Sequence, residues 1–393
     1  MDMAKPKIRF KGYTDEWEQR KLNEVTVKIG SGKTPSGGKS AYVDTGIPLI
    51  RSQNVNDDKV DFNDIVYIDE LTDESMANSR VFTNDVLLNI TGASIGRSAV
   101  YKGLDQANVN QHVCIVRPTD GYCPDFVQLN LASDSGQKQI ESSQAGGGRE
   151  GLNFQQIGKM HFSFPTLDEQ KQIGGYFNAL DNLITLHQRK CEQAKKLKKY
   201  MLQKMFPQNG QKVPEIRFKG FTDDWEQRKL SEFSEKTFGG GTPKTSNESF
   251  WKGNIPWIQS SDLIEGSLFD VEPRKYISQE AVDKSATKLV PENSVAIVTR
   301  VGVGKLAFMP FSYATSQDFL SLSVLKTEPQ FTVYALYKKL QLELNTVQGT
   351  SIKGVTKDEL LTKEIMIPCY EEQEKIGSYL HSLDRLITLH HRK

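Results

Sequence analysis

Apolar residues recur with the 3-4 spacing of a helix seam over a long stretch near the middle of the chain. Between residues 168 and 206 they fall at Ile173, Phe177, Leu180, Ile184, Cys191 and Ala194, with His187 in the slot between and a shifted continuation at Leu197, Met201 and Met205. This spacing predicts one long helix with a coiled-coil seam, roughly 58 Å long at about 1.5 Å per residue. Pro165 and Pro207 lie just outside its ends and act as stop signals.

Short runs rich in β-branched and aromatic residues alternate with turn residues on both sides of this helix. They lie at 47–52, 85–92, 113–118 and 161–165, and again at 255–260, 294–300, 319–326 and 364–368. Runs of this length between turn residues predict strands. We therefore expect an α+β protein whose mixed, mostly β domains lead into long helices.

The pattern occurs twice along the chain. Residues 8–24 and 216–232 are identical at 14 of 17 positions, and residues 168–190 and 371–393 at 14 of 23, whereas the sequence between them diverges. The offsets of 208 and 203 residues are too long for a solenoid, whose repeats run to about 20–50 residues. They indicate duplication of a whole domain together with its helix.

The duplication predicts four segments: a domain at 1–167, a helix at 168–207, a second domain at 208–370 and a second helix at 371–393. Two helices related by a pseudo-two-fold would pack as an antiparallel coiled coil. The alternative is that each helix only caps its own domain. The residues at 208–218 are interpreted as a short polar linker.

Composition narrows the class of protein. With 37% apolar and 25% charged residues the chain is typical of a globular protein, and it has no apolar run long enough to span a membrane. The first ten residues lack a signal-peptide pattern, and the four cysteines lack C-x-x-C spacing, so we expect reduced thiols and a cytoplasmic location.

The net charge of +1 is low for a nucleic-acid binder, because phosphate contacts usually dominate affinity. Positive charge is concentrated only at 187–206, which holds seven lysine and arginine residues against one acid, Glu192. This cluster could face phosphate or could be an ordinary solvated helix face.

Catalytic and cofactor motifs are missing from the sequence. The segment 30–34, GSGKT, has Val27 where a phosphate-binding loop needs its first glycine, and Gly241 replaces the lysine in the second copy. The shared part, G-x-T-P at 32–35 and 240–243, is better interpreted as a turn. The six histidines have no metal-binding spacing, and no catalytic set recurs. A binding protein without catalysis, cofactor or metal of its own is favoured.

Two motifs in the repeated segments carry a resemblance to a known family. The first is P-x-L-x-E-Q-x-x-I followed by L-D-x-x-I, at Pro165, Leu167, Glu169, Gln170, Ile173, Leu180, Asp181 and Ile184, and at Pro368, Glu372, Gln373, Ile376, Leu383, Asp384 and Ile387, with Tyr370 in place of the leucine. The second is W-E-x-x-K-L, at Trp17, Glu18, Lys21 and Leu22, and at Trp225, Glu226, Lys229 and Leu230. Over essentially its whole length the chain resembles specificity subunits of type I restriction–modification systems.

The resemblance implies a non-catalytic DNA-specificity subunit. Two target recognition domains would each read one half of a bipartite duplex target, and the antiparallel helices would act as a spacer. Two modification subunits carrying S-adenosylmethionine would methylate adenine, and restriction subunits using ATP and Mg²⁺ would translocate and cleave DNA. Two other classes remain open: a self-contained enzyme, and a tandem-repeat protein-binding adaptor that never contacts DNA.

Under this reading, DNA-contacting residues should be polar side chains on loops at matching places in the two copies. The candidates are Lys33, Arg51, Gln53, Asn54, Arg97, Gln111 and Arg149 in the first copy, and Lys244, Gln259, Ser261, Lys305, Gln317 and Lys353 in the second. A structural role for Gln111 and Gln317 stays open, because they persist while their neighbours change. Trp17 and Trp225 are expected to pack, and the repeated surfaces 168–190 and 371–393 to dock the modification subunits.

Overall fold

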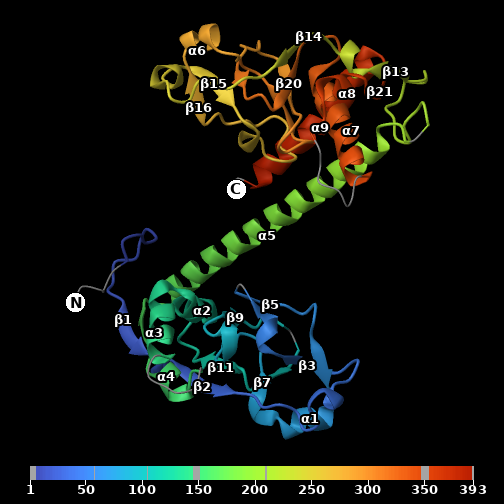
Figure 1. Ribbon diagram of the computed structural model, residues 1–393. Helices are drawn as coiled ribbons and strands as arrows, with labels where there is room; N and C mark the ends of the chain where they lie inside the picture. The colour runs from blue at the N-terminus through green and yellow to red at the C-terminus, as the bar shows by residue number, and fades with distance from the viewer. Residues whose placement is uncertain are drawn as a thin grey trace. The chain divides into compact units, whose positions relative to one another are not determined.

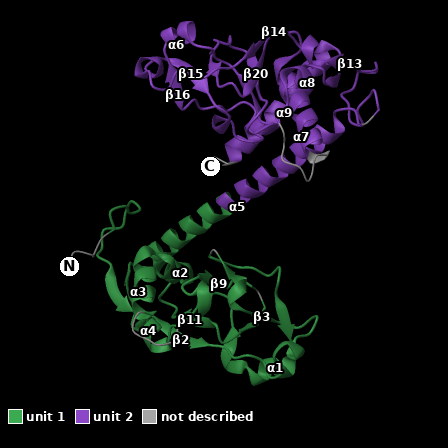
Figure 2. Cartoon of the chain, viewed as in Figure 1, with its two compact units in different colours: residues 1–183 green, residues 184–393 purple. Residues whose placement is uncertain are grey.

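The computed structural model describes residues 6–56, 58–103, 105–144, 151–208, 210–346 and 354–391. The chain forms two compact units, residues 1–183 and 184–393 (Figure 2). The division falls inside helix α5 (Leu167–Lys204), so this helix belongs partly to each unit. The four-segment division expected from the sequence stays a prediction.

The first unit contains two four-stranded sheets. One is antiparallel throughout and has the order β2 (Thr26–Ser31), β11 (Val113–Pro118), β8 (Val86–Asn89), β9 (Ser98–Val100). The other has the order β6 (Val66–Ile68), β3 (Ile47–Ile50), β10 (Ala107–Val109), β7 (Arg80–Val81), in which β3 and β10 are parallel. Two short pairs complete the strands: β1 (Glu18–Lys21) with β12 (His161–Phe164), and β4 (Val55–Asn56) with β5 (Lys59–Val60).

The second unit repeats this topology, except that its smaller sheet has three strands. Its antiparallel sheet has the order β14 (Ser234–Gly239), β20 (Phe319–Leu325), β17 (Ser294–Val298), β18 (Leu306–Met309). Its smaller sheet has the order β16 (Lys275–Ile277), β15 (Ile255–Ile258), β19 (Ala314–Thr315), in which β15 and β19 are parallel. The strand β13 (Glu226–Lys229) pairs with β21 (Glu364–Ile367) as β1 does with β12.

Helices pack around the sheets of each unit: the first helix of each unit lies beside the smaller sheet, and others lie on one face of the antiparallel sheet. The first unit has α1 (Glu70–Ser75), α2 (Pro124–Ala132), α3 (Asp134–Gln144) and α4 (Phe154–Gly158); the second has α6 (Gln279–Lys284), α7 (Pro329–Thr346) and α8 (Lys357–Leu361) (Figure 1). Strand β8 is apolar on both faces because Leu87 packs toward the smaller sheet and Leu88 toward the helix side. The predicted α+β fold is confirmed, and each run expected to be extended contains a strand.

A buried ion pair joins the two repeated segments within each unit. Arg9 donates to both carboxylate oxygens of Glu169 at 2.6 Å, and Arg217 donates to both oxygens of Glu372 at 2.8 Å. Both glutamates are fully buried. The carboxylate raises the pKa of the arginine in each pair, chiefly through the hydrogen bonds. This pairing explains why the arginine and the glutamate recur together in both copies.

The glutamine of the repeated E-Q dipeptide also makes identical contacts in the two units. Gln170 accepts from the amide of Cys123 and donates to the carbonyl of Pro165, at 3.0 and 2.8 Å. Gln373 accepts from Glu328 and donates to Pro368 at the same distances. Trp17 and Trp225 pack edge-on against phenylalanine rings, which confirms the expected packing role. We refer to these matched contacts as the common frame.

The long helix is confirmed, but it ends earlier than the sequence suggested. It stops at Lys204, whose carbonyl accepts from the amide of Ile216. Met205 and Phe206, which continue the seam in the sequence, leave the helix and are buried in the core of the second unit. The helix therefore ends where burial of Met205 and Phe206 draws the chain away from the helix axis, and Pro207 prevents it from continuing.

Within the second unit, the last part of α5 runs antiparallel to α9 (Tyr370–His391). His187 Nδ1 lies 2.9 Å from His390 Nδ1, Cys191 Sγ lies 3.8 Å from the carbonyl of Ile387, and Lys198 Nζ lies 2.5 Å from Asp384 Oδ1. Tyr334 of α7 donates to the other oxygen of Asp384, and burial together with this carboxylate raises the pKa of Tyr334. This part of α5 and α9 therefore pack antiparallel, as the sequence predicts, whereas the seam residues Phe177, Leu180 and Ile184 remain exposed.

All four cysteines lie in the described part of the chain and are free thiols, as expected. Among the described helices, none is both long and apolar enough to cross a membrane.

Candidate nucleic-acid interface

In each unit several of the predicted polar residues follow the two parallel strands of the smaller sheet: Arg51, Gln53, Asn54 and Gln111 in the first unit, and Gln259, Ser261 and Gln317 in the second. Parallel neighbours end at the same edge, and the amide of Asn110 after β10 donates to the carbonyl of Ile50 at the end of β3. In the second unit Ser316 after β19 donates in the same way to Ile258 of β15. The loops after these strands are therefore held side by side in both units.

The G-x-T-P turn rests on this edge. A Cβ atom on Gly32 would lie 1.6 Å from the carbonyl oxygen of Val109, and one on Gly240 would lie 1.8 Å from that of Ser316. Only glycine fits such a close approach of two backbones. Close packing of this turn therefore places the threonine that follows the glycine, Thr34 or Thr242, near the end of the parallel strand β10 or β19.

The threonine of each turn fixes the glutamine that the sequence singled out. Thr34 donates to Gln111 Oε1 at 2.6 Å, and Thr242 donates to Gln317 Oε1 at 2.7 Å. Both glutamines remain exposed. Each Oε1 can accept a second bond, so a structural role and a recognition role are compatible at this position.

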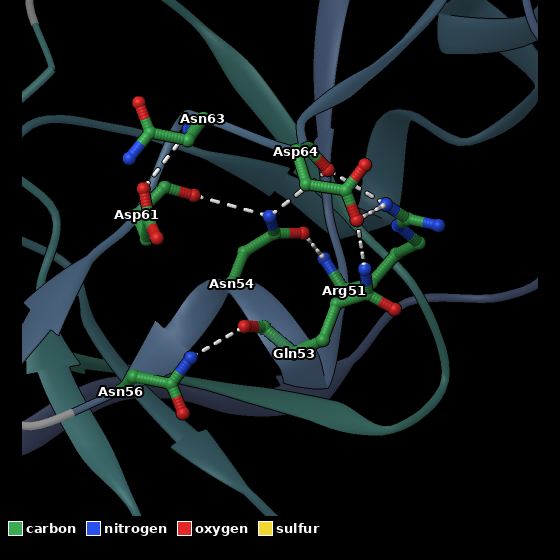
Figure 3. Close-up of polar contacts among 7 residues, drawn as sticks. All are labelled: Arg51, Gln53, Asn54, Asn56, Asp61, Asn63 and Asp64. Atoms are coloured by element: carbon green, nitrogen blue, oxygen red, sulfur yellow. Dashed lines mark hydrogen bonds and ion pairs between the residues drawn. The ribbon is translucent and has the colours of Figure 1, made fainter. Parts of the chain in front are cut away.

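In the first unit the loop after β3 is organised around Asp64 (Figure 3). Arg51 donates to the carbonyl of Asp64 at 2.7 Å and to its carboxylate at 3.3 Å, and Gln53 donates to the same carboxylate. Asn54 is only 2% exposed; it accepts from the amide of Arg51 and donates to the carbonyl of Asp61. Since Asn54 is committed to the loop itself, we leave it out of the proposed contact surface.

The matching loop of the second unit has a reversed charge arrangement. Asp262 replaces Asn54, is buried, and accepts from the amide of Gln259 at 3.0 Å. Arg274, on the segment that leads into β16, lies 3.7 Å from Asp262. Ser261 is exposed at the tip, and Gln259 is half-buried.

Arg97 and Lys305 occupy equivalent places, because their carbonyls accept from Asn89 and Val298 at the ends of β8 and β17. Arg97 donates to Asn56 Oδ1, and Lys305 donates to the carbonyl of Ser260 at 3.4 Å.

These contacts hold both side chains against the loop after the parallel strand. Lys33 and Lys244 are exposed on the turn. Arg149 and Lys353 lie outside the described residues.

The lysine-rich part of α5 is partly neutralised. Lys195 pairs with Glu192, Lys198 with Asp384 and Lys204 with Glu215. A single phosphate-facing surface over 187–206 is therefore not favoured. Among the described residues, no group of three or more histidine, cysteine or acidic side chains is placed to hold a metal ion.

Comparison with known proteins places this geometry in a family. The family described as the type I restriction modification DNA specificity domain matches residues 14–196 and again 222–393. The chain belongs to this family. The observation that decides it is that two separate matches cover both copies of the duplicated domain, from before Trp17 and Trp225 to beyond Gln170 and Gln373.

Relatives of this specificity subunit match over different lengths. A protein named as the MjaX specificity subunit of a type I restriction enzyme, from Methanocaldococcus jannaschii, is 24% identical over 388 residues, covering 95% of this chain and 88% of the relative. The EcoR124I/EcoR124II specificity subunit of Escherichia coli is 30% identical over 162 residues, 38% of this chain and 39% of the relative. The type I S subunit crystal structure from M. genitalium shares the fold, with a TM-score of 0.60, 12% identity and coverage of 98% and 94%.

Sequence reasoning missed several polar residues at the same edge. In the second unit, Arg300 and Lys357 line an open groove of about 930 Å³ together with Gln317. In the first unit, His112 contacts both Gln111 and Thr91. The sequence does contain a signal for Arg300, because it is the first charged residue after the apolar run of β17. The candidates were chosen mainly from the loops after the parallel strands, and Arg300 lies on a different loop.

Proposed function

We propose that this chain reads a two-part duplex DNA target, with one part read by each unit, and that it assembles the catalytic subunits around that target. The observation that carries the proposal is the pairing of a common frame with diverged polar loops at the same sheet edge. Matched frames present two surfaces in equivalent ways, and different side chains on them suit two different half-sites.

The loops supply suitable groups for both kinds of DNA contact. Gln111, Gln317 and Arg97 offer donors and acceptors that match base edges in the major groove. Lys33 and Lys244 are exposed cations on the turn and are suited to phosphate, which fixes register without reading sequence. The net charge of +1 implies that partner subunits share the phosphate contacts.

The repeated frame is the proposed docking surface for two copies of one modification subunit. A surface that occurs twice in equivalent form fits two identical partners. The modification subunits would carry S-adenosylmethionine and methylate adenine, and restriction subunits would use ATP and Mg²⁺. In this arrangement the chain supplies recognition and assembly, and its partners supply the chemistry.

The test is to express the chain with its modification subunits and to map methylated adenines in cells with and without it. The expected result is one bipartite motif that disappears when the chain is absent. Replacing residues 30–160 with those of a relative should change one half of the motif and leave the other intact. Equal binding of the assembled complex to specific and random duplexes would instead favour a protein-binding adaptor.

A further inference from the structure

The second residue after strand β8 in the first unit and after strand β17 in the second unit differs in charge: it is Thr91 in one and Arg300 in the other. In the first unit the amide of Ile90 donates to the carbonyl of His112, and the carbonyl of Ile90 accepts from Leu152. In the second unit Thr299 donates to Asp318 and accepts from Val355 in the same way. Thr91 and Arg300 come next in the chain, so they occupy the same place.

In the first unit this place is closed by a chain of hydrogen bonds. Thr34 donates to Gln111 Oε1, the Gln111 amide nitrogen lies 3.0 Å from His112 Nε2, and His112 Nδ1 contacts Thr91 Oγ1. An amide nitrogen only donates, so His112 Nε2 accepts, and in the neutral ring the proton is on Nδ1. Thr91 is therefore already used inside the unit.

In the second unit the same place is open. Asp318 stands where His112 does, and its carboxylate accepts from Ser316 at 3.3 Å. Arg300 is exposed, and among the described residues of the chain it makes no ion pair or side-chain hydrogen bond. This distinguishes it from Arg51 and Arg97, which are held by Asp64 and Asn56.

The surroundings of Arg300 suit contact with a base. It lines the groove of about 930 Å³ beside Gln317, whose Oε1 is fixed by Thr242. A guanidinium presents two parallel donors, which match O6 and N7 of guanine in the major groove. Lys357 lines the same groove and is an exposed cation for the neighbouring phosphate.

We propose that Arg300 is a specificity-determining residue of the second unit and reads a guanine, and that Thr91 gives the first unit no guanine contact at the equivalent place. This inference rests on the proposed function, because it requires that the second unit reads DNA. It assigns the chemical identity of one contact in one half-site.

The experiment uses the full chain assembled with its modification subunits on its mapped target. Each guanine of the half-site assigned to the second unit is replaced in turn by 7-deazaguanine, which lacks the N7 acceptor. Wild type should lose affinity at one position, by at most the roughly 5- to 150-fold that a whole bidentate base contact of about 1–3 kcal/mol supplies, because the O6 acceptor remains. Arg300→Ala, which leaves no donor at this position, should bind the natural and the substituted duplex equally.

Two further variants separate geometry from charge. Arg300→Lys keeps the positive charge and a donor but lacks the planar fork, so it should keep only part of the guanine preference and more affinity than Arg300→Ala. Lys252→Gln removes one charge from an exposed site of the same unit, 73% exposed, and should leave the preference unchanged.

Three outcomes would overturn the assignment: a second-unit half-site without guanine, an Arg300→Ala variant that still responds to 7-deazaguanine, or a loss of affinity in that variant that is equal for all sequences. The last result would mean a phosphate contact. If wild-type complex shows no sequence preference at all, the proposed function itself fails, which is a distinguishable result.

Discussion

The two units share one set of buried contacts and differ in the contacts at the edge of the smaller sheet. Arg9 with Glu169 and Arg217 with Glu372 form the same buried pair, and the E-Q glutamines bind the same backbone groups. At the sheet edge the charges are instead rearranged. Arg51 faces Asp64 in the first unit, whereas the buried acid Asp262 faces Arg274 in the second.

The difference shows where the protein can change without losing its fold. The ion pairs of the frame are buried and join residues 160 and 155 positions apart. Altering one partner therefore leaves a buried charge unpaired. The edge residues lie on loops held by backbone bonds, such as Asn110 to Ile50, which any side chain permits. Recognition can therefore diverge on a scaffold that stays constant.

The largest expected effect comes from removing a buried leucine from the frame of either unit, and it tests whether the two frames contribute equally to the free energy of unfolding. Leu22 and Leu230 are fully buried at matching places, and their amides donate to Met160 and Lys363. Leu22→Ala and Leu230→Ala should each lower the free energy of unfolding by about 2–5 kcal/mol. Urea titration followed by hydrogen exchange of each unit would measure this. A large loss in one variant and a small loss in the other would break the comparison.

A second prediction concerns the glycine that lets each frame helix approach its neighbour. A Cβ on Gly174 would lie 2.9 Å from Asp125 Cβ, and one on Gly377 would lie 2.8 Å from the amide of Phe331. Gly174→Ala and Gly377→Ala should each cost about 1–3 kcal/mol through overpacking.

The matched control is the next residue, Gly175, where an added Cβ meets nothing within 4 Å. Gly175→Ala should stabilise the helix by up to about 1 kcal/mol, because alanine has the higher helix propensity. Thermal unfolding of the three variants would show whether the signs differ as expected.

A third prediction sharpens the contrast at the edge. Asp64 is exposed and holds Arg51 and Gln53, so its charge opposes any phosphate that approaches this loop. Asp64→Asn should tighten DNA binding by the assembled complex about fivefold at low salt, since one charge at about 4 Å in water is worth about 1 kcal/mol.

For this prediction the control is Asp120→Asn, an exposed acid beyond the far end of β11, which should leave affinity nearly unchanged. Filter-binding or fluorescence titrations would compare the two variants. An equal gain in both would mean that general charge, and not the loop after β3, sets the effect.

The smallest expected effect belongs to the second unit alone. Burial lowers the pKa of Lys338 to about 8, from 10.5. Between these values the unfolded chain holds more protons at this residue than the folded chain, so its contribution to stability rises with pH. After screening by water, the gain between pH 8 and pH 10 should be less than about 1 kcal/mol.

Lys338→Met should remove this contribution. The measurement compares how the free energy of unfolding changes with pH in the variant and in wild type. Lys338→Arg should remove the pH dependence too, but it keeps a charge near the carbonyls of Phe206 and Pro207. A pH dependence identical to wild type in both variants would contradict the assignment.

Much of the fold could be predicted from the sequence because its signals are local. The seam from Ile173 to Met201 and the apolar runs that became β8, β11 and β17 depend only on spacing and residue type. The end of α5 could not be predicted, because Met205 and Phe206 continue the seam and only the core of the second unit draws them out of the helix.

At the edge, the sequence pointed to the right loops but not to the state of each side chain. Gln111 and Gln317 were identified as matching polar residues, yet only the structure shows that a threonine of the glycine turn holds each one. Asn54 was chosen for its chemistry and is buried, while Arg300 was missed and is open. Burial and pairing depend on residues far away in the chain.

The sequence by itself determined that the chain is a duplication with a shared frame, because two segments can be compared residue by residue without knowing how the chain folds. Tertiary structure alone decided which polar side chains remain free at the strand ends. The reason is physical: an exposed arginine and a paired one look alike along the chain, and they differ only in what the fold places opposite them.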